Sequence, residues 1–275
     1  PDPATITGCL TDPAWDRAQE GWVQFTGATI QPSNGSAIDL TFDTVKNINL
    51  LSLQGSLYTD LINNEVIPLG SYDWIRLHVN ASNDSVNDSY IKLNDGSIHE
   101  LWIPSGSQTG LNINTVFELI ATETLNLMID FDLRKSVVES NGDYKLRPTL
   151  RMVNMRNSGA ITGTIDAAQL TGPNCPDEDP ATGNAVYLFE GTNTTPEDMR
   201  NGNFGPLTSG NVELNVSSGN YEYEIGFVPA GNYTLAFTCQ ADLDDPGVND
   251  NIAFSFSENV TVVVDQSTPL PDPVR

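Results

Sequence analysis

The sequence predicts an all-β protein of two β-sandwich (Ig-like/transthyretin-like) domains in series, with a few short helices. Three observations support this fold class. Short runs in which apolar and polar residues alternate recur along the whole chain, which is the pattern of half-buried strands. Clusters of Gly, Asn, Asp, Ser and Pro separate these runs at regular intervals, as is typical of sandwiches. No long amphipathic helical stripe interrupts them.

The strands expected in the first half of the chain are joined by recognisable turns. An Asp95-Gly96 pair lies between two alternating runs and predicts a tight hairpin, and Asn141-Gly142 predicts another. Asp132 is well placed to cap a short helix over residues 133–136, although Asp130 and Asp132 also form a possible acid pair. The expected strands are 22–30, 37–42, 74–80, 90–93, 98–103, 116–121, 125–131 and 149–155, with further short helices after Asp12 and over 56–62.

A second set of strands follows a boundary near residue 156. These strands are expected at 160–165, 185–189, 212–216, 221–228, 233–239, 252–256 and 260–264. The boundary falls between one strand that closes a domain and another that opens one. We therefore expect a first domain over residues 1–156, a second over 157–265, and an extended Pro-rich tail over 266–275.

The charge of the chain excludes several classes of function. Its 275 residues include 36 acidic and 12 basic residues, a formal net charge of −24. A surface this negative repels phosphate backbones and anionic lipids, which excludes nucleic-acid binding and attraction to such membranes. No apolar run is long enough to span a bilayer. The chain begins with Pro1 rather than Met, so we expect a secreted or cell-surface protein whose signal peptide has been removed.

Three cysteines are present, and an odd number in a secreted protein suggests one disulfide and one remaining thiol. Cys175 and Cys239 both lie in the second domain, and we expect them to pair. The disulfide closes a loop of about 64 residues, which the chain-entropy model values at ~4 kcal/mol. Cys9 is then free, buried as a small apolar residue, or bonded to another chain.

Acidic residues follow both of these paired cysteines. If the disulfide forms, it brings the two acidic loops together, and dense oxygen ligands suit Ca²⁺. The alternative is a pair of solvated loops whose Asp and Asn residues serve turns. The sequence does not fit an EF-hand, because Pro246 and Ala253 occupy ligand positions. The candidate calcium ligands are Asp177, Asp179, Asp242, Asp244, Asp245 and Asp250.

Sequence motifs for catalysis are weak. His78 and His99 are the only histidines, and each lies in or beside an expected strand. The segment 106–110 has the glycine spacing of a nucleophile elbow, but Gln108 stands at the nucleophile position. No P-loop or dinucleotide fingerprint is present. We therefore expect a protein that is not an enzyme.

Two stretches resemble known families. Residues 1–155 resemble domain-of-unknown-function family 4382, found in secreted and surface proteins of bacteria; the resemblance implies location and architecture but no chemistry. It is carried by residues 10–14, 69–77, 104–111, 129–133 and 144–148. Residues from about 158 to 265 resemble a carboxypeptidase-regulatory or transthyretin-like sandwich, through 159–165, 184–189, 219–223 and 227–235. That resemblance implies a stalk, spacer or adhesive unit.

The leading hypothesis is a non-catalytic extracellular structural protein, such as the subunit of a pilus-like filament or an adhesive building block. Its partners are then further copies in a head-to-tail polymer, or other surface proteins. We expect strand exchange through the chain ends to drive assembly. The residues expected to take part are Thr5, Ile6, Cys9, Val260, Val262 and Val264.

Two other functions remain open. One is a monomeric module that binds carbohydrate or another ligand through exposed aromatic residues such as Trp22, Trp74 or Trp102. Each tryptophan could instead pack in a core. The other is a hydrolase, since paired carboxylates for glycoside cleavage occur in any acidic sequence.

Overall fold

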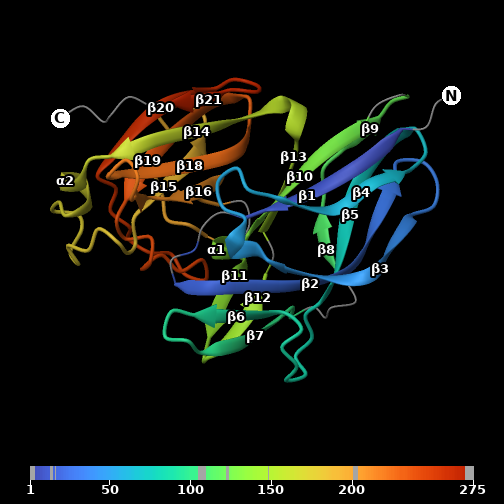
Figure 1. Cartoon of the computed structure of the whole chain (residues 1–275), viewed down its shortest axis with the longest axis horizontal. Coiled ribbons are helices and arrows are strands. Elements are labelled where there is room, and N and C mark those ends of the chain that lie inside the picture. Colours follow the sequence, from blue (N-terminus) through green and yellow to red (C-terminus); the bar gives the residue numbers. More distant parts are fainter. Residues whose placement is uncertain are drawn as a thin grey trace.

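The computed structural model (Figure 1) describes residues 4–12, 15, 17–104, 110–121, 124–147, 149–200 and 204–269. Within these ranges the chain is all-β, and α-helix is confined to α1 (Leu133–Ser136) and α2 (Ala167–Leu170). Strands β1 to β13 form two sheets, and β14 to β21 form two others. The sheets therefore divide the chain into a first and a second domain.

The larger sheet of the first domain has nine strands in the order β11-β12-β7-β6-β2-β5-β8, with β3 paired to β2 and β9 paired to β5. Both hairpins expected from Asp95-Gly96 and Asn141-Gly142 form, as β6–β7 and β11–β12. The bounds are β2 (Ala18–Pro32), β3 (Ile38–Asn49), β5 (Gly70–Asn80), β6 (Tyr90–Leu93), β7 (Ile98–Trp102), β8 (Leu111–Ile113), β9 (Phe117–Leu119), β11 (Val137–Ser140) and β12 (Asp143–Leu146).

The smaller sheet of the first domain has the order β13-β10-β1-β4. Its central strand β1 (Thr5–Thr11) runs parallel to β10 (Thr124–Asp132) and antiparallel to β4 (Thr59–Val66), and β13 (Thr149–Asn154) forms the far edge. The helix expected over 56–62 is wrong. Leu61 and Ile62 are buried in β4, which follows the short 3₁₀ helix η1 (Leu50–Ser52), so pairing with β1 decides the conformation of this segment.

Side chains from both sheets fill the core of the first domain. Ile6 and Leu10 from β1 and Phe25 from β2 are fully buried there. Phe25 meets Phe131 of β10 edge to face, with ring centroids 6.4 Å apart. Each such side chain contributes roughly 1.5–3 kcal/mol by leaving water, so this core holds the two sheets together.

The second domain consists of two four-stranded sheets, in the orders β17-β18-β14-β21 and β16-β15-β19-β20. Their inward faces share a core that includes Ile161, Leu188 and Phe237. Cys175 and Cys239 are joined by a disulfide, with Cα atoms 5.4 Å apart, at the edge of this core. The bounds are β14 (Ser158–Ile165), β15 (Ala185–Glu190), β16 (Thr208–Asn211), β17 (Glu213–Asn215), β18 (Asn220–Pro229), β19 (Gly231–Thr238), β20 (Phe256–Val262) and β21 (Ser267–Pro269).

The connection between the domains is a single turn. Strand β13 leads into the 3₁₀ helix η3 (Met155–Asn157), where the Asn154 side chain accepts the backbone N–H of Arg156, and β14 begins at the next residue. The expected end of the second domain at residue 265 is too early. Residues 267–269 form β21, which pairs in parallel with β14, so the start of the expected tail belongs to the sheet.

No helix in the described part of the chain is long and apolar enough to cross a membrane.

Candidate functional site at the domain seam

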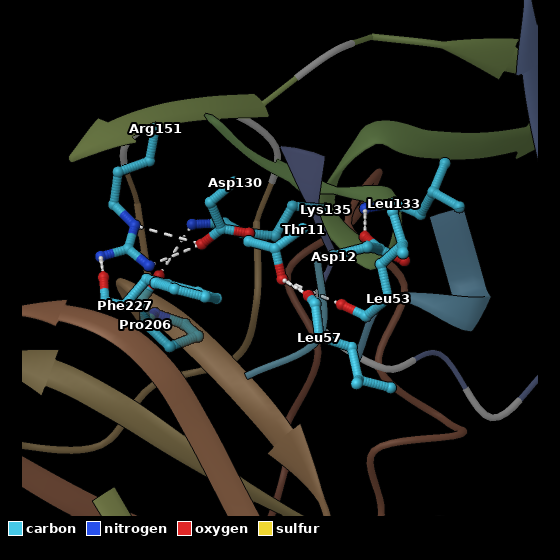
Figure 2. Close-up of polar contacts among 10 residues, drawn as sticks. All are labelled: Thr11, Asp12, Leu53, Leu57, Asp130, Leu133, Lys135, Arg151, Pro206 and Phe227. Atoms are coloured by element: carbon cyan, nitrogen blue, oxygen red, sulfur yellow. Dashed lines mark hydrogen bonds and ion pairs between the residues drawn. The ribbon is translucent and has the colours of Figure 1, made fainter. Parts of the chain in front are cut away.

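The candidate site is the set of buried polar contacts between the two domains, here called the seam (Figure 2). It begins at helix α1, which follows directly on β10. Asp132 caps this helix by accepting the N–H of Lys135 at 2.8 Å. Asp12, at the end of β1, accepts the N–H of Leu133 at 2.8 Å. Two carboxylates therefore fix one turn of helix whose next two side chains, Arg134 and Lys135, contact the second domain.

Arg134 is the largest fully buried side chain in the described structure. Its guanidinium donates to Asn211 Oδ1 at 2.9 Å and to the carbonyl of Ala241 at 3.4 Å. It also lies near Tyr187, whose hydroxyl donates to the buried Asp244 at 2.7 Å. Because a buried charge without partners costs several kcal/mol, these contacts hold the second domain against α1.

Lys135 and Arg151 cross the seam beside it. The Lys135 ammonium donates to the carbonyl of Pro206 at 2.8 Å. Arg151 donates twice to Asp130 Oδ2, at 2.6 and 3.1 Å, and once to the carbonyl of Phe227 at 3.3 Å. Figure 2 shows these cations between the acidic residues of the first domain and backbone carbonyls of the second. Charge-assisted bonds of this kind are stronger than neutral ones.

A loop of the first domain extends the seam. The Thr11 hydroxyl lies 2.9 Å from the carbonyl oxygens of both Leu53 and Leu57, which holds the loop between them in place. A Cβ added to Gly226 would lie 2.3 Å from the Gly55 carbonyl oxygen, so the two backbones meet at a point where only glycine fits. Ser56, the next loop residue, also bonds across the seam: its hydroxyl donates to the carboxylate of Glu224.

Phe227 has an unusual conformation beside this contact. Its φ is +52°, a left-handed value that is uncommon for a residue with a side chain. The conformation presents its carbonyl to Arg151, and its ring meets Tyr58 of the first domain edge to face at 5.8 Å. Strain of this kind persists only where the surroundings fix it, which here are contacts from the other domain.

Apart from the exposed Glu224, the carboxylates of the seam outnumber its cations by one. Four carboxylates (Asp12, Asp130, Asp132 and Asp244) lie with three cations (Arg134, Lys135 and Arg151). Burial raises the pKa of Asp132 to about 6 and that of Asp244 to about 6, and it raises the pKa of Asp12 well above its usual value. Burial also lowers the pKa of Lys135. A single proton on one carboxylate would balance the group.

A small cavity of about 10 Å³ lies in the seam, lined in part by Thr11, Asp12, Asp130 and Ser209. Asp12 Oδ2, Asp130 Oδ1 and Ser209 Oγ are buried and have no hydrogen-bond partner among the described residues. The volume is about that of one water-sized probe, and a water there would find polar partners. The seam thus consists of paired charges and one water-sized cavity, an arrangement that holds the two domains in a fixed relative position.

A larger open cleft of about 610 Å³ lies next to the seam. Gln54 and Gly55 of the first domain line one side, and β14 and β16–β18 line the other. Glu213 and Glu222 stand directly opposite each other on β17 and β18 within it. Glu222 accepts bonds from Asn215 and Ser218, which lower the pKa of its carboxyl.

The disulfide brings the two acidic loops together, with Ala241 donating to the Gly183 carbonyl at 2.9 Å. Their carboxylates, however, take different partners. No group of three or more His, Cys, Asp or Glu residues that could hold a metal occurs among the described residues, so calcium binding stays a prediction. Asp177 is exposed, Asp179 accepts from Ala181 and Thr182, Asp242 lies against Gly183, Asp244 bonds Tyr187, Asp245 accepts from Gly247, and Asp250 accepts from Asp245.

The residues expected to drive assembly occupy two different positions. Thr5, Ile6 and Cys9 lie in β1, which has a neighbouring strand on each side. The Cys9 thiol is buried and donates to Asp60 Oδ1 at 3.3 Å, and burial raises its pKa to about 12. In this fold Cys9 is therefore free and buried, and a bond to another chain would first require β1 to leave its sheet.

The C-terminal candidates are more accessible. Val260 and Val262 lie in β20, which ends its sheet and has β19 as its partner. Their side chains point into the core, but the backbone forms the sheet edge. Val264 lies in the turn that leads to β21.

The seam residues were missed by the sequence reasoning, which treated Asp132 as a helix cap and Asp130 as its possible acid partner. A signal was present: Arg134 and Lys135 are adjacent cations between two apolar runs in a chain with only 12 basic residues. Strand alternation gives no partner for them, because their contacts come from residues 71, 77 and 107 positions further along the chain.

The comparisons place the first domain in a family. No curated protein matches the sequence. Among solved structures, the TIE protein of Bacillus anthracis matches at 10% identity and a TM-score of 0.21, over 96% of this chain and 32% of that one. The minor pilin GBS52 of Streptococcus agalactiae matches at 11% and 0.21, over 98% and 99%. The fimbrial anchor protein Mfa2 of Porphyromonas gingivalis matches at 10% and 0.21, over 92% and 81%.

Similarities at this level carry no argument about function, and the chain spans about a third of the Bacillus anthracis protein. The model of one sequence family, by contrast, matches residues 4–148, which is more than half of the chain. That match ends before the second domain, whose resemblance to carboxypeptidase-regulatory sandwiches remains a prediction. The chain belongs to the family described as domain of unknown function DUF4382.

Proposed function

We propose that this protein is a non-catalytic building block of an extracellular or cell-surface assembly, such as a filament subunit. The observation that carries the proposal is the seam, in which the buried Arg134 and Lys135 and the half-buried Arg151 join two β domains into one unit. Relative motion is the default for two domains of one chain, and the seam opposes it, because separating the domains would leave buried charges without partners. A stiff joint suits a part that must pass force between neighbours.

The placement of the chain ends supports the same proposal. Strand β1 begins at the end of the first domain far from the second, while β21 lies on the second domain (Figure 1). Neighbours joined through these ends would add in the same direction. Head-to-tail contacts form a ring if the rotation between neighbours closes, and a filament if it does not.

The C-terminal region is the preferred site of contact. Strand β20 ends its sheet, and β21 is a three-residue strand at the edge of the other sheet. An edge strand is a template for pairing with another chain, and a strand of three residues makes few ladder bonds that a strand from a neighbour would have to replace. Strand β1 is less suitable, because its removal would uncover Ile6 and Leu10, both fully buried.

Three chain lengths test the proposal: the full chain, a chain ending at Pro269 that keeps β21, and a chain ending at Gln266 that lacks it. We expect the full chain to form large particles at seawater salt with millimolar Ca²⁺, because salt screens the net charge of −24. The chain ending at Gln266 should remain monomeric, and its melting temperature reports whether the second domain still folds without β21.

Analytical ultracentrifugation and negative-stain microscopy measure both outcomes. A full chain that stays monomeric in every condition would show that the protein is not a self-assembling subunit. Equal assembly of all three chains would reject terminal exchange and leave the building-block role in place. Metal-free buffer with EDTA serves as the control for the calcium expectation.

A further inference from the structure

The outward face of the nine-stranded sheet carries a line of three half-exposed aromatic residues, here called the aromatic strip: Trp22 on β2, Tyr90 on β6 and Trp102 on β7. Trp22 is directly opposite Tyr90, and Tyr90 is directly opposite Glu100. Trp102 lies two residues beyond Glu100, so it is diagonal to Tyr90 on the same face. Two strand spacings separate β2 from β7, which gives the strip a width of about 10 Å.

These rings are held in place by polar partners. Trp22 and Tyr90 are stacked, with centroids 6.4 Å apart and planes inclined by 25°. The Trp22 indole N–H donates to Glu20 at 2.7 Å, and Lys92 donates to the same carboxylate at 3.0 Å. The Lys145 ammonium lies 5.6 Å from the centre of the Trp102 ring. Little rotamer freedom is therefore left to lose when a ligand binds.

The tryptophans do not share one role. Trp15 is buried in the core of the first domain, at 7% exposure. Trp22, Trp74 and Trp102 are half-exposed on the outward face instead. Trp74 is separate from the strip: it pairs with Gln31, near the other end of β2. The Arg76 guanidinium lies 4.8 Å from the centre of the Trp74 ring, much as Lys145 lies over Trp102. Trp74 is therefore a matched control outside the strip.

We propose that the aromatic strip is a binding platform for a neutral polysaccharide. The two faces of a sugar ring present C–H groups, which pack on flat aromatic rings, and its rim presents hydroxyls. Amide side chains flank the strip on the same face: Gln24 donates to Asn47 and accepts from Asn80. These groups offer both donors and acceptors to the hydroxyls of a bound chain.

Charge decides between the occupants of this face. A net charge of −24 repels an anionic polymer, and the contacts proposed between copies lie at the chain ends rather than on this face. The charges at the strip are already engaged, Glu20 with Lys92 and Glu100 with the backbone N–H groups of Asp84 and Val86. A neutral, hydroxyl-rich partner meets neither repulsion nor a need to break these bonds.

The test uses the full chain and a panel of insoluble neutral polysaccharides (cellulose, xylan, β-1,3-glucan and chitin), with alginate as the anionic comparison. We expect the wild type to sediment with at least one neutral polymer. Trp22→Ala and Trp102→Ala should each weaken that binding tenfold or more, whereas Trp74→Ala should bind as the wild type does. Melting temperatures report whether each variant is folded, and Tyr90→Phe should retain binding because it keeps the ring.

Several results would overturn the proposal. These are no binding to any neutral polymer, preference for alginate, or equal losses in the Trp74→Ala variant. If Trp22→Ala fails to fold, Trp102→Ala decides alone. Sedimentation of the free protein is measured in parallel, and a dimer that disappears in Trp102→Ala would assign the strip to contacts between copies. Assembly through the chain ends is read separately, so this test can fail without affecting the proposed function.

Discussion

Aspartates at the seam and aspartates in the disulfide loops have the same side chain and opposite roles. At the seam, Asp130 and Asp132 are 4% exposed; Asp130 pairs with Arg151 of the neighbouring strand, and Asp132 lies near Lys135 of α1. In the loops, Asp179 and Asp245 accept backbone N–H groups two residues ahead, which are local turn bonds. The difference shows that acid density alone does not locate a site in this chain; burial against a cation does.

The largest expected effect comes from removing the central cation of the seam. Arg134→Ala removes the donor to Asn211 and to the Ala241 carbonyl and takes a nearby cation from the buried Asp244, and removing one partner of a buried charge pair costs about 3–5 kcal/mol. We expect the urea unfolding curve to split into two transitions, because the domains no longer unfold together. The control Arg17→Ala removes an ion pair with Glu139 in which both side chains are 42% exposed, and should change stability by less than about 1 kcal/mol. If Arg134→Ala unfolds in a single transition at the urea concentration of the wild type, the seam does not couple the two domains.

A second effect is pH dependence of the seam. The pKa values of Asp132 and Asp244 are raised to about 6 in the fold, so the folded state binds protons that the unfolded state has released. This contribution to stability is complete below the unfolded pKa near 3.9 and is lost as pH rises through about 6. Since a shift of one pKa unit corresponds to 1.36 kcal/mol, each of these two carboxyl groups contributes up to about 3 kcal/mol to the free energy of unfolding at low pH.

Measurements of the free energy of unfolding across that pH range test whether stability falls as pH rises. Asp132→Asn and Asp244→Asn should flatten the pH profile, while Asp177→Asn, at an exposed loop position, should leave its slope unchanged. A wild-type profile whose stability instead rises steadily across this window, with no change in slope in the two seam variants, would contradict the assignment.

The smallest expected effect is in the disulfide loops. Asp179→Ala removes acceptors for the Ala181 N–H and the Thr182 hydroxyl, which are local turn contacts at the surface, so we expect only a small fall in stability. The measurement is the melting temperature of the second domain, with Asp177→Ala as the matched control in the same loop. A loss as large as that of Arg134→Ala would remove the distinction between the two groups of aspartates.

Much of the fold follows from local patterns. The hairpin at Asn141-Gly142 was predictable because both residues take positive φ, at 56° and 82°, and these residue types tolerate that conformation. The helix cap at Asp132 was predictable for a similar reason, since its side chain bonds the N–H three residues ahead. The pairing of Cys175 with Cys239 followed from their common position in the second domain.

Other features depend on contacts that sequence does not record. Strand β1 pairs in parallel with β10, more than 100 residues later, and no turn signals such a partner. The segment 59–66 became a strand because β1 offered an edge. The seam depends on Arg134 meeting Asn211 and Ala241, and its existence could be inferred only from the rarity of cations in this chain.

Because the Cys9 thiol is buried in β1, the rate at which it is chemically modified reports how often this strand opens. The thiol is 3% exposed and its pKa is raised to about 12, so the folded state presents almost no reactive thiolate at neutral pH. Alkylation must then wait until β1 separates from β4 or β10. The labelling rate therefore counts those openings, in a single subunit or within a polymer, and it does so without any engineered probe.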